Sequence, residues 1–414
     1  MDLKQQMRSL AERSRDASRA LAKLDANQKN ALLRAMADGI EKSAATIKSA
    51  NAKDLDAAGK SGLSSAMLDR LTLTEKRVSE MARGVREVAD LPDPVGTTIS
   101  EWTRPNSIRI RKVRVPIGVI LIIYESRPNV TADAACLCFK TGNAVILRGG
   151  SEAIHSNLAI AEAMTVPGVP PNSITVVPTT DRAAIDELLK LDDLINLCIP
   201  RGGEGLIRAV AEKSRIPVIK HYKGVCHVYV DREADFDMAE KIVINAKCQR
   251  PGVCNAIETL LIDEKIADKF LPRIGKALTD KKVELRGDER TRQLVSSAKP
   301  AIEDDWYAEY LDLILAVRVV NGVDAAIAHI TKYGSAHSDA IVTANKATAD
   351  KFLREVDSSS VFWNASTRLA DGGQYGFGAE IGISTDKIHA RGPMGLEELT
   401  SYKFVVVGDG QVRE

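Results

Sequence analysis

Apolar side chains recur at three- and four-residue spacing through the first hundred residues, the period of helices with one buried face. One helix is expected to begin at Thr74, a suitable N-cap, and to end before Pro92 and Pro94, which cannot continue a helix. Between residues 30 and 50 the apolar stripe predicts one continuous helix and comprises Leu33, Met36, Ala37, Ile40, Ala44 and Ile47.

After Ser107 the pattern changes to that of strands. Residues 108–115 alternate between apolar and polar, with a slip near Lys112, which predicts an exposed, bulged strand. Short, continuously apolar runs then alternate with helical stretches, both before and after Cys254. Such runs suit strands covered on both faces, so the sequence predicts two α/β domains with parallel sheets. The predicted strands are residues 117–123, 143–148, 173–178, 194–199, 216–220 and 227–231, then 257–262, 313–320, 339–344 and 359–364, with a late strand in 401–414 that pairs outside its own domain.

The composition is that of an ordinary globular protein of two or three domains, with 414 residues and a formal charge of +1. This balance predicts no nucleic-acid partner and no attraction to an anionic membrane. The longest apolar stretch, Val115–Tyr124, is too short to span a bilayer, and the N-terminus lacks the apolar core of a signal peptide. The six cysteines form no C-x-x-C pair, so we expect reduced thiols in a cytoplasmic protein.

Several common motifs are absent. No G-x-G-x-x-G follows a predicted strand, and Gly59-Lys60-Ser61 lacks the first glycine of a P-loop because position 54 is Asp54. Cys136 and Cys138 would face apart on a helix, so no metal site is expected.

The most informative run is Asn245–Ile262, where a Gln-Arg-Pro-Gly turn joins a helix to a strand and Cys254 follows directly. Asn255 and the neighbouring peptide N–H groups could stabilise a negative charge there, and Arg250 is a candidate source of positive potential. A free thiol has a pKa of about 8.5, and lowering it to about 7 would make roughly half of the thiol reactive. Alternatively, Cys254 is a small apolar residue at the start of a buried strand. Cys248, which continues the preceding helix, is expected to be a structural residue of this kind. The residues alone leave both interpretations of Cys254 open.

This run resembles the active-site segment of the γ-glutamyl phosphate reductases, a family of the aldehyde dehydrogenase superfamily. The resemblance covers nearly the whole chain and is carried also by residues 122–131, 142–153, 200–210, 219–231, 329–341 and 359–403. It implies an aldehyde-dehydrogenase-like α/β fold of two domains plus a β-flap for oligomerisation. The implied NADP-binding domain is residues 1–97 and 118–225, the catalytic domain 226–383, and the flap 98–117 and 384–414.

The resemblance also implies the chemistry. Cys254 attacks the acyl carbon of L-glutamyl 5-phosphate and forms a thioester, which NADPH reduces to L-glutamate 5-semialdehyde in L-proline biosynthesis. Asn129 corresponds to the superfamily's oxyanion asparagine; its alternative is a turn or helix-cap asparagine after Pro128.

For the cofactor, Arg148 is expected to grip the 2′-phosphate, which favours NADP over NAD, with Glu152 nearby. Gly202 and Gly203 resemble the turn where a helix N-terminus faces the pyrophosphate. Glu309 resembles the glutamate that contacts the nicotinamide ribose. Arg148 and Glu309 could instead be surface charges.

Arginines in the motif segments could bind the anionic ends of the substrate. Arg127 and Arg250 are the better candidates, ahead of Arg368 and Arg391, because they are nearest in sequence to Asn129 and Cys254. Each could equally be a structural ion-pair partner.

One departure from the superfamily bears on the reaction. Hydrolytic members carry a general-base glutamate in a Glu-Leu-Gly-Gly-Lys run, whereas residues 221–225 here contain no carboxylate. This argues against oxidation of an aldehyde to an acid.

The expected assembly is a homodimer or tetramer, with a possible transient contact with glutamate 5-kinase. The alternatives are an acylating dehydrogenase acting on another acyl phosphate or a thioester such as that of coenzyme A, a silent binding protein, and a pyridoxal phosphate enzyme using Lys220.

Overall fold

The computed structural model describes residues 2–125 and 127–413, which fold into two compact units. The first unit comprises residues 2–125, 127–220, 377–382 and 394–413, and the second comprises residues 221–376 and 383–393. Each has its own parallel sheet. The assignment of cofactor binding to residues 1–97 and 118–225, and of catalysis to 226–383, stays a prediction.

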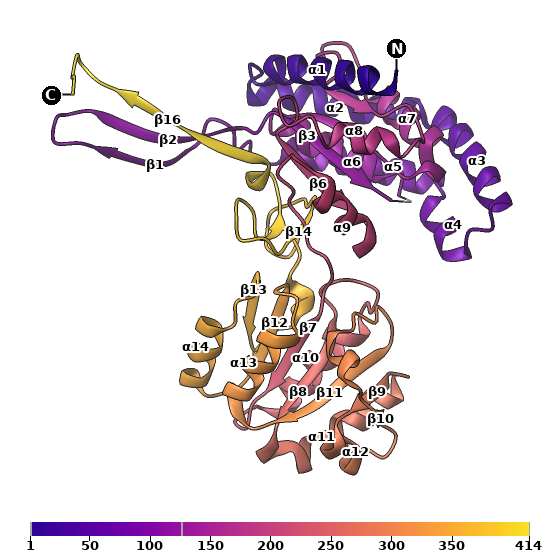
Figure 1. Ribbon diagram of the computed structural model, residues 1–414, viewed down its shortest axis with the longest axis vertical. Helices are drawn as coiled ribbons and strands as arrows, with labels where there is room; N and C mark the ends of the chain where they lie inside the picture. Colours follow the sequence, from indigo (N-terminus) through magenta and orange to yellow (C-terminus); the bar gives the residue numbers. More distant parts are fainter. Residues whose placement is uncertain (1, 126, 414) are drawn as a thin grey trace. The chain divides into compact units, whose positions relative to one another are not determined.

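The first unit is built on four parallel strands in the order β5-β4-β3-β6, with helices around them (Figure 1). All six residues of β3 (Val119–Tyr124) are buried, which explains its continuously apolar sequence. The other strands are β4 (Ala144–Arg148), β5 (Ile174–Val176) and β6 (Leu197–Arg201). The helices are α1 (Leu3–Leu21), α2 (Ala26–Lys42), α3 (Ala44–Lys60), α4 (Ser65–Leu71), α5 (Glu75–Asp90), α6 (Val130–Lys140), α7 (Ile154–Ala163), α8 (Ala183–Leu188) and α9 (Glu204–Lys213).

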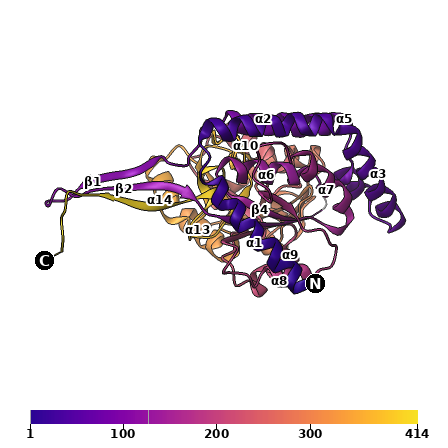
Figure 2. The same ribbon diagram turned by 90° about the horizontal axis from the view of Figure 1, so that it is seen from above.

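The prediction of one continuous helix over residues 30–50 is wrong, because α2 ends and α3 begins at Ser43, although both parts are helical. The apolar stripe continues across this break, with Ile40 and Ile47 both buried, so the hydrophobic period cannot reveal it. The helix from Thr74 is confirmed as α5, and the Thr74 side chain accepts a hydrogen bond from the Arg77 N–H. Helices α2 and α5 lie side by side (Figure 2).

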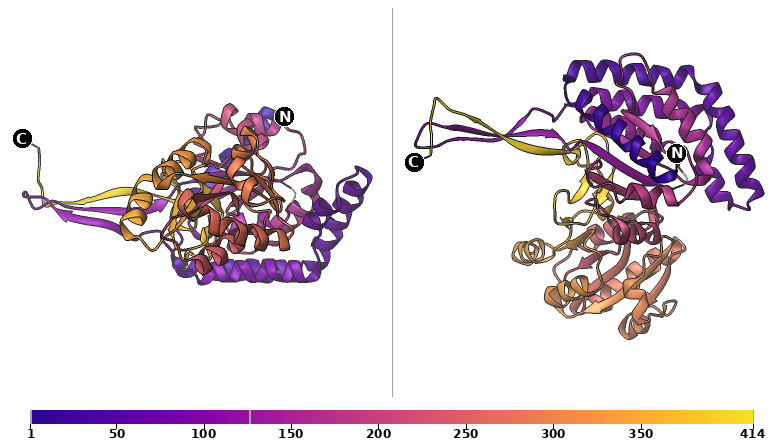
Figure 3. Two further views of the ribbon diagram at one scale, coloured as in Figure 1. Left: turned by 90° about the horizontal axis from the view of Figure 1, so that it is seen from below. Right: turned by 45° about the horizontal axis from the view of Figure 1, so that its top comes forward.

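A separate antiparallel sheet contains β1 (Thr98–Thr103), β2 (Arg109–Pro116) and β16 (Thr400–Val407), and β16 lies along the β1–β2 hairpin in each view (Figures 2 and 3). Thr98 pairs with Val113 and Ser100 with Lys112, so the extra residue, Ile99, lies on β1 opposite the predicted slip. The bulge therefore lies at the predicted point of the hairpin, near Lys112, but the extra residue is on β1 and not on β2. The late strand pairs with β2, from the first third of the chain.

The second unit has seven parallel strands in the order β10-β9-β11-β8-β7-β12-β13. Val228 and Leu260 belong to one apolar cluster with α10 and α11, whereas their neighbours Tyr229 and Leu261 belong to another with α13 and α14. Both faces of this sheet are therefore buried. The strands are β7 (Cys226–Val230), β8 (Ile257–Asp263), β9 (Glu284–Gly287), β10 (Lys299–Pro300), β11 (Ile314–Val320), β12 (Ser338–Val342) and β13 (Ser360–Trp363), and the helices are α10 (Phe236–Cys248), α11 (Glu264–Asp280), α12 (Glu289–Leu294), α13 (Gly322–Tyr333) and α14 (Lys346–Glu355).

Some strands differ from the predictions. Strand β10, at one edge of the sheet, and its neighbour β9 are short and lie outside the predicted strands. The predicted strand at 216–220 makes only an isolated bridge, Cys198 to Val218, because Pro217 has no N–H to extend the ladder. The chain also forms a short two-stranded sheet, β14 (Gly382–Ser384) with β15 (Gly392–Met394). In the described part of the chain, every helix is too short or too polar to cross a bilayer.

Two glycines test the helical packing of the first unit. A Cβ on Gly39 would overlap the carbonyl oxygen of Ala163, whereas a Cβ on Gly84 would meet nothing within 4 Å. We predict that Gly39→Ala destabilises the unit by about 1–3 kcal/mol through overpacking. Gly84→Ala, on α5, should stabilise it by about 0.5–1 kcal/mol because alanine favours a helix interior.

Thermal unfolding of both variants checks this. The midpoint should fall for Gly39→Ala and stay or rise for Gly84→Ala; equal shifts in the two variants would contradict the packing described.

Candidate active site

Three segments meet at the amino-terminal edge of the second sheet. Strands β11, β8 and β7 are neighbours and parallel, so the residues that precede them lie at the same edge. Glu309 precedes β11, Cys254 precedes β8 and Gly224 precedes β7. The sheet topology therefore assembles residues that are far apart in sequence.

The main chains of Gly224 and Cys254 are in close contact. A Cβ on Gly224 would lie 2.7 Å from Cys254 Cα and 2.6 Å from its carbonyl carbon, so only glycine fits. The Cys226 thiol, two residues further on, donates to the Cys254 carbonyl oxygen at 3.1 Å. The Gly224 N–H donates to Glu309 Oε1 at 2.8 Å, so the predicted ribose-binding glutamate is held beside the backbone of Cys254.

The turn that carries Cys254 is held by Arg368, which follows β13. Its guanidinium donates to Gln249 Oε1 at 2.9 Å and to Asn255 Oδ1, on either side of the cysteine. Burial, together with the like charge of Arg250, lowers the Arg368 pKa, while Asp371 and Cys254 oppose this. The Arg368 charge therefore interacts with the Cys254 thiol, although the two residues are distant in sequence.

Asn255 is part of this support. It is buried, its Nδ2 donates to the Ala370 carbonyl at 2.9 Å, and its backbone carbonyl accepts from Thr367 Oγ1 at 2.7 Å. Since its carboxamide is bound at both ends, Asn255 holds the turn.

The remaining candidate arginines lie in different settings. Arg250 is exposed and makes no hydrogen bond or ion pair with another residue that the structure describes. Arg391 is paired with Asp357 at 2.8 Å, which favours a structural role. Arg127 is exposed in the segment before α6. The substrate-binding roles of Arg127 and Arg250 stay predictions.

Two histidines lie near this edge. His221 Nδ1 donates to the Ile383 carbonyl at 3.0 Å. His337 is fully buried beside Cys226 Sγ, at 3.6 Å, and burial lowers its pKa to about 3. His337 is therefore neutral near pH 7 and adds no charge to the site.

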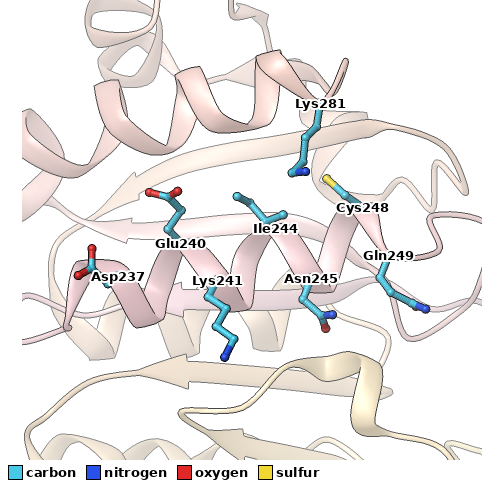
Figure 4. A pocket seen from close by; sticks show the side chains of 8 residues that line it. All are labelled: Asp237, Glu240, Lys241, Ile244, Asn245, Cys248, Gln249 and Lys281. Atoms are coloured by element: carbon cyan, nitrogen blue, oxygen red, sulfur yellow. The ribbon is translucent and has the colours of Figure 1, made fainter.

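Of the six cysteines, only Cys248 and Cys254 are partly exposed. Cys248 ends α10 as predicted and faces a shallow hollow of 390 Å³ (Figure 4). Burial raises the pKa of its thiol, against the opposing effects of Lys281 and Lys247. Burial likewise raises the pKa of the thiols of Cys136, Cys138, Cys198 and Cys226. This leaves Cys254 as the candidate nucleophile. The hollow is lined by Asp237, Glu240, Lys241, Ile244, Asn245, Cys248, Gln249 and Lys281.

Asn129 lies in the first unit, at the N-cap position of α6, and its side chain makes no capping hydrogen bond. Its Nδ2 instead donates to Asp133 Oδ2 at 3.0 Å, one turn further along the helix. Burial raises the Asp133 pKa to about 6, although the Asn129 hydrogen bond lowers it. Asn129 therefore occupies the turn and N-cap position of the alternative interpretation, although its side chain does not cap the helix, and the oxyanion role stays a prediction.

A cavity of 910 Å³ lies in the first unit, at the carboxyl ends of its strands. It is lined by the predicted cofactor residues Arg148 and Glu152 and also by Arg182. Arg148 is buried and donates to the carbonyls of Gly149 and Thr180 (3.0 Å for Thr180), and burial lowers its pKa. Arg182 is exposed, and its side chain makes no hydrogen bond or ion pair within the described residues. Sequence reasoning missed Arg182, which lies in the segment after β5, whereas Arg148 is the last residue of β4.

The N-terminus of α9 borders this region. Gly203 is its N-cap, and a Cβ on Gly203 or Gly205 would meet nothing within 4 Å, so the backbone there is open to a ligand. The Gly203 N–H donates to Glu125 Oε2 at 3.0 Å, and a Cβ on Gly202 would clash with the same carboxylate. A carboxylate at this position is what the partial positive charge of a helix N-terminus attracts. The cavity and the helix N-terminus therefore fit a dinucleotide carrying phosphate groups. Among the described residues, no cluster of His, Cys, Asp and Glu could hold a metal ion.

Comparison with known proteins agrees with this geometry. Residues 3–299 match the model of the aldehyde dehydrogenase family. The γ-glutamyl phosphate reductase of Geobacter metallireducens is 60% identical over 100% of both chains. The crystal structure of the γ-glutamyl phosphate reductase of Thermotoga maritima superposes with a TM-score of 0.97 at 47% identity, covering 99% of this chain and 100% of that one. An acetylating aldehyde dehydrogenase of Geobacillus thermoglucosidasius, at 17% identity and a TM-score of 0.66 over 100% of this chain and 98% of that one, shares the fold.

The predicted aldehyde-dehydrogenase-like α/β fold is confirmed. The chain belongs to the aldehyde dehydrogenase family and, within it, to the γ-glutamyl phosphate reductases.

Proposed function

We propose that this chain catalyses the NADPH-dependent reduction of γ-glutamyl phosphate to glutamate 5-semialdehyde, with release of phosphate, as a step of proline biosynthesis. The observation that carries the proposal is the packing of the 221–225 segment, which has no carboxylate, against the main chain of Cys254. In the hydrolytic enzymes that this chain resembles, a glutamate in that segment activates water. Without it, a thioester on Cys254 survives long enough to be reduced.

The steps follow from the groups around Cys254. Its thiolate attacks the acyl carbon, the C–O bond to phosphate breaks, and phosphate leaves with the electron pair, so that a thioester forms. NADPH supplies the hydride when it is bound. The resulting thiohemiacetal loses the Cys254 thiolate and yields the aldehyde. Arg368 favours the thiolate electrostatically. We assign stabilisation of the tetrahedral oxygen to the Cys254 N–H and to Asn129.

The chain's own groups suit NADP. We assign the 2′-phosphate to Arg182 in place of Arg148, because the Arg148 guanidinium is bound to the carbonyls of Gly149 and Thr180. Arg148 and Glu152 then frame the adenosine ribose, and Gly202 and Gly203 lie at the pyrophosphate. Glu125, which now accepts from the Gly203 N–H, would have to yield that donor to the cofactor. We assign the nicotinamide ribose to Glu309.

The antiparallel sheet of β1, β2 and β16 supports an assembly role. It presents exposed apolar side chains, including Trp102, Phe404 and Val406, the last 58% exposed. A face of this kind is typical of protein–protein contacts. We propose that it joins copies of this chain into a homodimer or tetramer, in the cytoplasm, with glutamate 5-kinase as a possible transient partner that delivers the labile acyl phosphate.

The first prediction tests the nucleophile by running the reaction backwards. With glutamate 5-semialdehyde, NADP and phosphate, wild type should form NADPH, and Cys254→Ala should lower the rate by about 10⁴-fold or more because the covalent route is lost. Cys248→Ala, the matched control, should retain activity. Activity that needs no phosphate would indicate a hydrolytic dehydrogenase, and a requirement for coenzyme A in its place would support an acylating dehydrogenase.

The second prediction concerns cofactor choice. Arg182→Ala should weaken NADPH binding by about 10- to 100-fold, the value of a charge-assisted hydrogen bond, and leave NADH binding unchanged. Lys213→Ala is the control, because Lys213 lines the same cavity but is paired with Asp186 at 2.9 Å. Titration with both cofactors measures this; equal losses for NADPH and NADH would remove Arg182 from the 2′-phosphate site.

The third prediction is a pH dependence. Burial raises the Asp133 pKa to about 6, so its carboxylate is ionised above that pH and is protonated as the pH falls through it. Protonation weakens the acceptor that orients the Asn129 amide, so kcat should decline on the acid side with an inflection near this value. Asp133→Asn should remove that inflection from the profile; identical acid limbs in wild type and variant would contradict the assignment.

A further inference from the structure

A buried ion pair joins the two sides of the Cys254 turn. Lys247 lies in the last turn of α10, before the cysteine, and Glu258 lies on β8, after it. Lys247 Nζ is 2.6 Å from Glu258 Oε2, and both side chains are 0% exposed. The pair therefore connects the helix and the strand that flank the nucleophile.

The second carboxylate oxygen of Glu258 has a different partner. Its Oε1 accepts a hydrogen bond from the backbone N–H of Leu311 at 3.2 Å. Leu311 has a φ of +54°, in the left-handed region that residues other than glycine rarely adopt. A backbone in that conformation persists only where neighbouring contacts hold it. Glu258 is one of those contacts.

Leu311 belongs to the segment 308–313, which joins the 3₁₀ turn η2 (Glu303–Tyr307) to β11 and which we term the Glu309 loop. Two residues before Leu311, the Glu309 side chain accepts from the Gly224 N–H at 2.8 Å. Between them, the Tyr310 hydroxyl donates to Asp305 Oδ1 at 2.8 Å. The Glu309 loop is thus held at two points. Glu258, on the strand after Cys254, binds the Leu311 N–H, and Glu309 binds the N–H of Gly224, which packs against Cys254.

Stability alone does not account for the pair. Removing two charges from water is costly, and buried ion pairs can often be replaced by apolar side chains of similar volume without loss of stability. Burial raises the Glu258 pKa to about 7 despite the favourable charge of Lys247, which shows the cost of desolvation here. A leucine or methionine, however, could not accept from the Leu311 N–H.

We propose that Glu258, itself oriented by Lys247, is a positioning residue that fixes the Glu309 loop and thereby sets where Glu309 holds the nicotinamide end of the cofactor. The inference rests on the proposed function, in which Glu309 binds the nicotinamide ribose. Glu258 touches neither substrate nor cofactor and acts through the backbone of Leu311.

Two double variants isolate the hydrogen bond to Leu311. Both remove the buried ion pair, but Lys247→Met with Glu258→Gln keeps an acceptor for the Leu311 N–H, whereas Lys247→Met with Glu258→Leu does not. The probes are NADPH and adenosine 2′,5′-bisphosphate, which carries the phosphorylated adenosine half without the nicotinamide. Dissociation constants are measured for both probes with each variant and with wild type, and folding is checked by thermal unfolding.

The leucine-containing variant should bind NADPH about tenfold or more weakly while binding the bisphosphate as wild type does, since only the nicotinamide side is displaced. The glutamine-containing variant should stay within about threefold of wild type for both probes. Equal NADPH affinity in the two variants, or equal weakening of both probes, would overturn the proposal. If the leucine-containing variant does not fold, Glu258→Asp retains the charge opposite Lys247 but withdraws the acceptor from Leu311, and the same selective loss is expected; unchanged NADPH binding would overturn the proposal.

Glu309→Gln separates this inference from the function on which it rests. If Glu309→Gln binds NADPH as wild type does, the assignment of Glu309 to the nicotinamide ribose fails. If Glu309→Gln weakens NADPH binding but the Glu258 variants do not, the assignment stands and the positioning role of Glu258 is wrong.

Discussion

The site depends on the close approach of two backbones, at Gly224 and Cys254. A Cβ on Gly224 would lie 2.7 Å from Cys254 Cα, so any other residue would push the 221–225 segment away from the cysteine. This contact places the Gly224 N–H where it binds Glu309, and it brings Cys226 under the Cys254 carbonyl. The backbone of Cys254 is therefore held at the start of strand β8, next to strand β7. The positions of the surrounding groups depend on the contact between Gly224 and Cys254.

Each sheet carries its candidate functional residues at one end of its strands, and the two sheets differ in which end this is. In the first unit, the cavity and its arginines lie at the carboxyl ends of the parallel strands, where α/β sheets commonly bind ligands. In the second unit, the cysteine, the glycine and the glutamate precede their strands and lie at the amino-terminal edge. Because each sheet is buried on its faces by helices, the strands are rigid, and loops at their ends can hold functional groups in fixed positions.

Much of this could be predicted from the sequence. The continuously apolar runs indicate both sheets, and the resemblance offers the cysteine, Glu309 and the cofactor residues as candidates. The sequence does not reveal which side chains, distant along the chain, are in contact in the fold. Arg368 was ranked below Arg250 because it is distant along the chain, yet its guanidinium bridges Gln249 and Asn255. The break at Ser43 was invisible because the apolar stripe runs through it. Glu258 did leave a signal, since a carboxylate inside the apolar run IETLLI demands a buried partner.

The central claim is an acyl bond between Cys254 and the glutamyl group, and trapping that bond tests it most directly. Wild-type protein is mixed with γ-glutamyl phosphate in the absence of NADPH, quenched in acid, and analysed by intact and peptide mass spectrometry. We expect one glutamyl group per chain on the peptide that contains Cys254, and we expect it to disappear when NADPH is added before the quench. Continuous release of phosphate without an acyl group on Cys254, or acylation of Cys248 in its place, would contradict this claim.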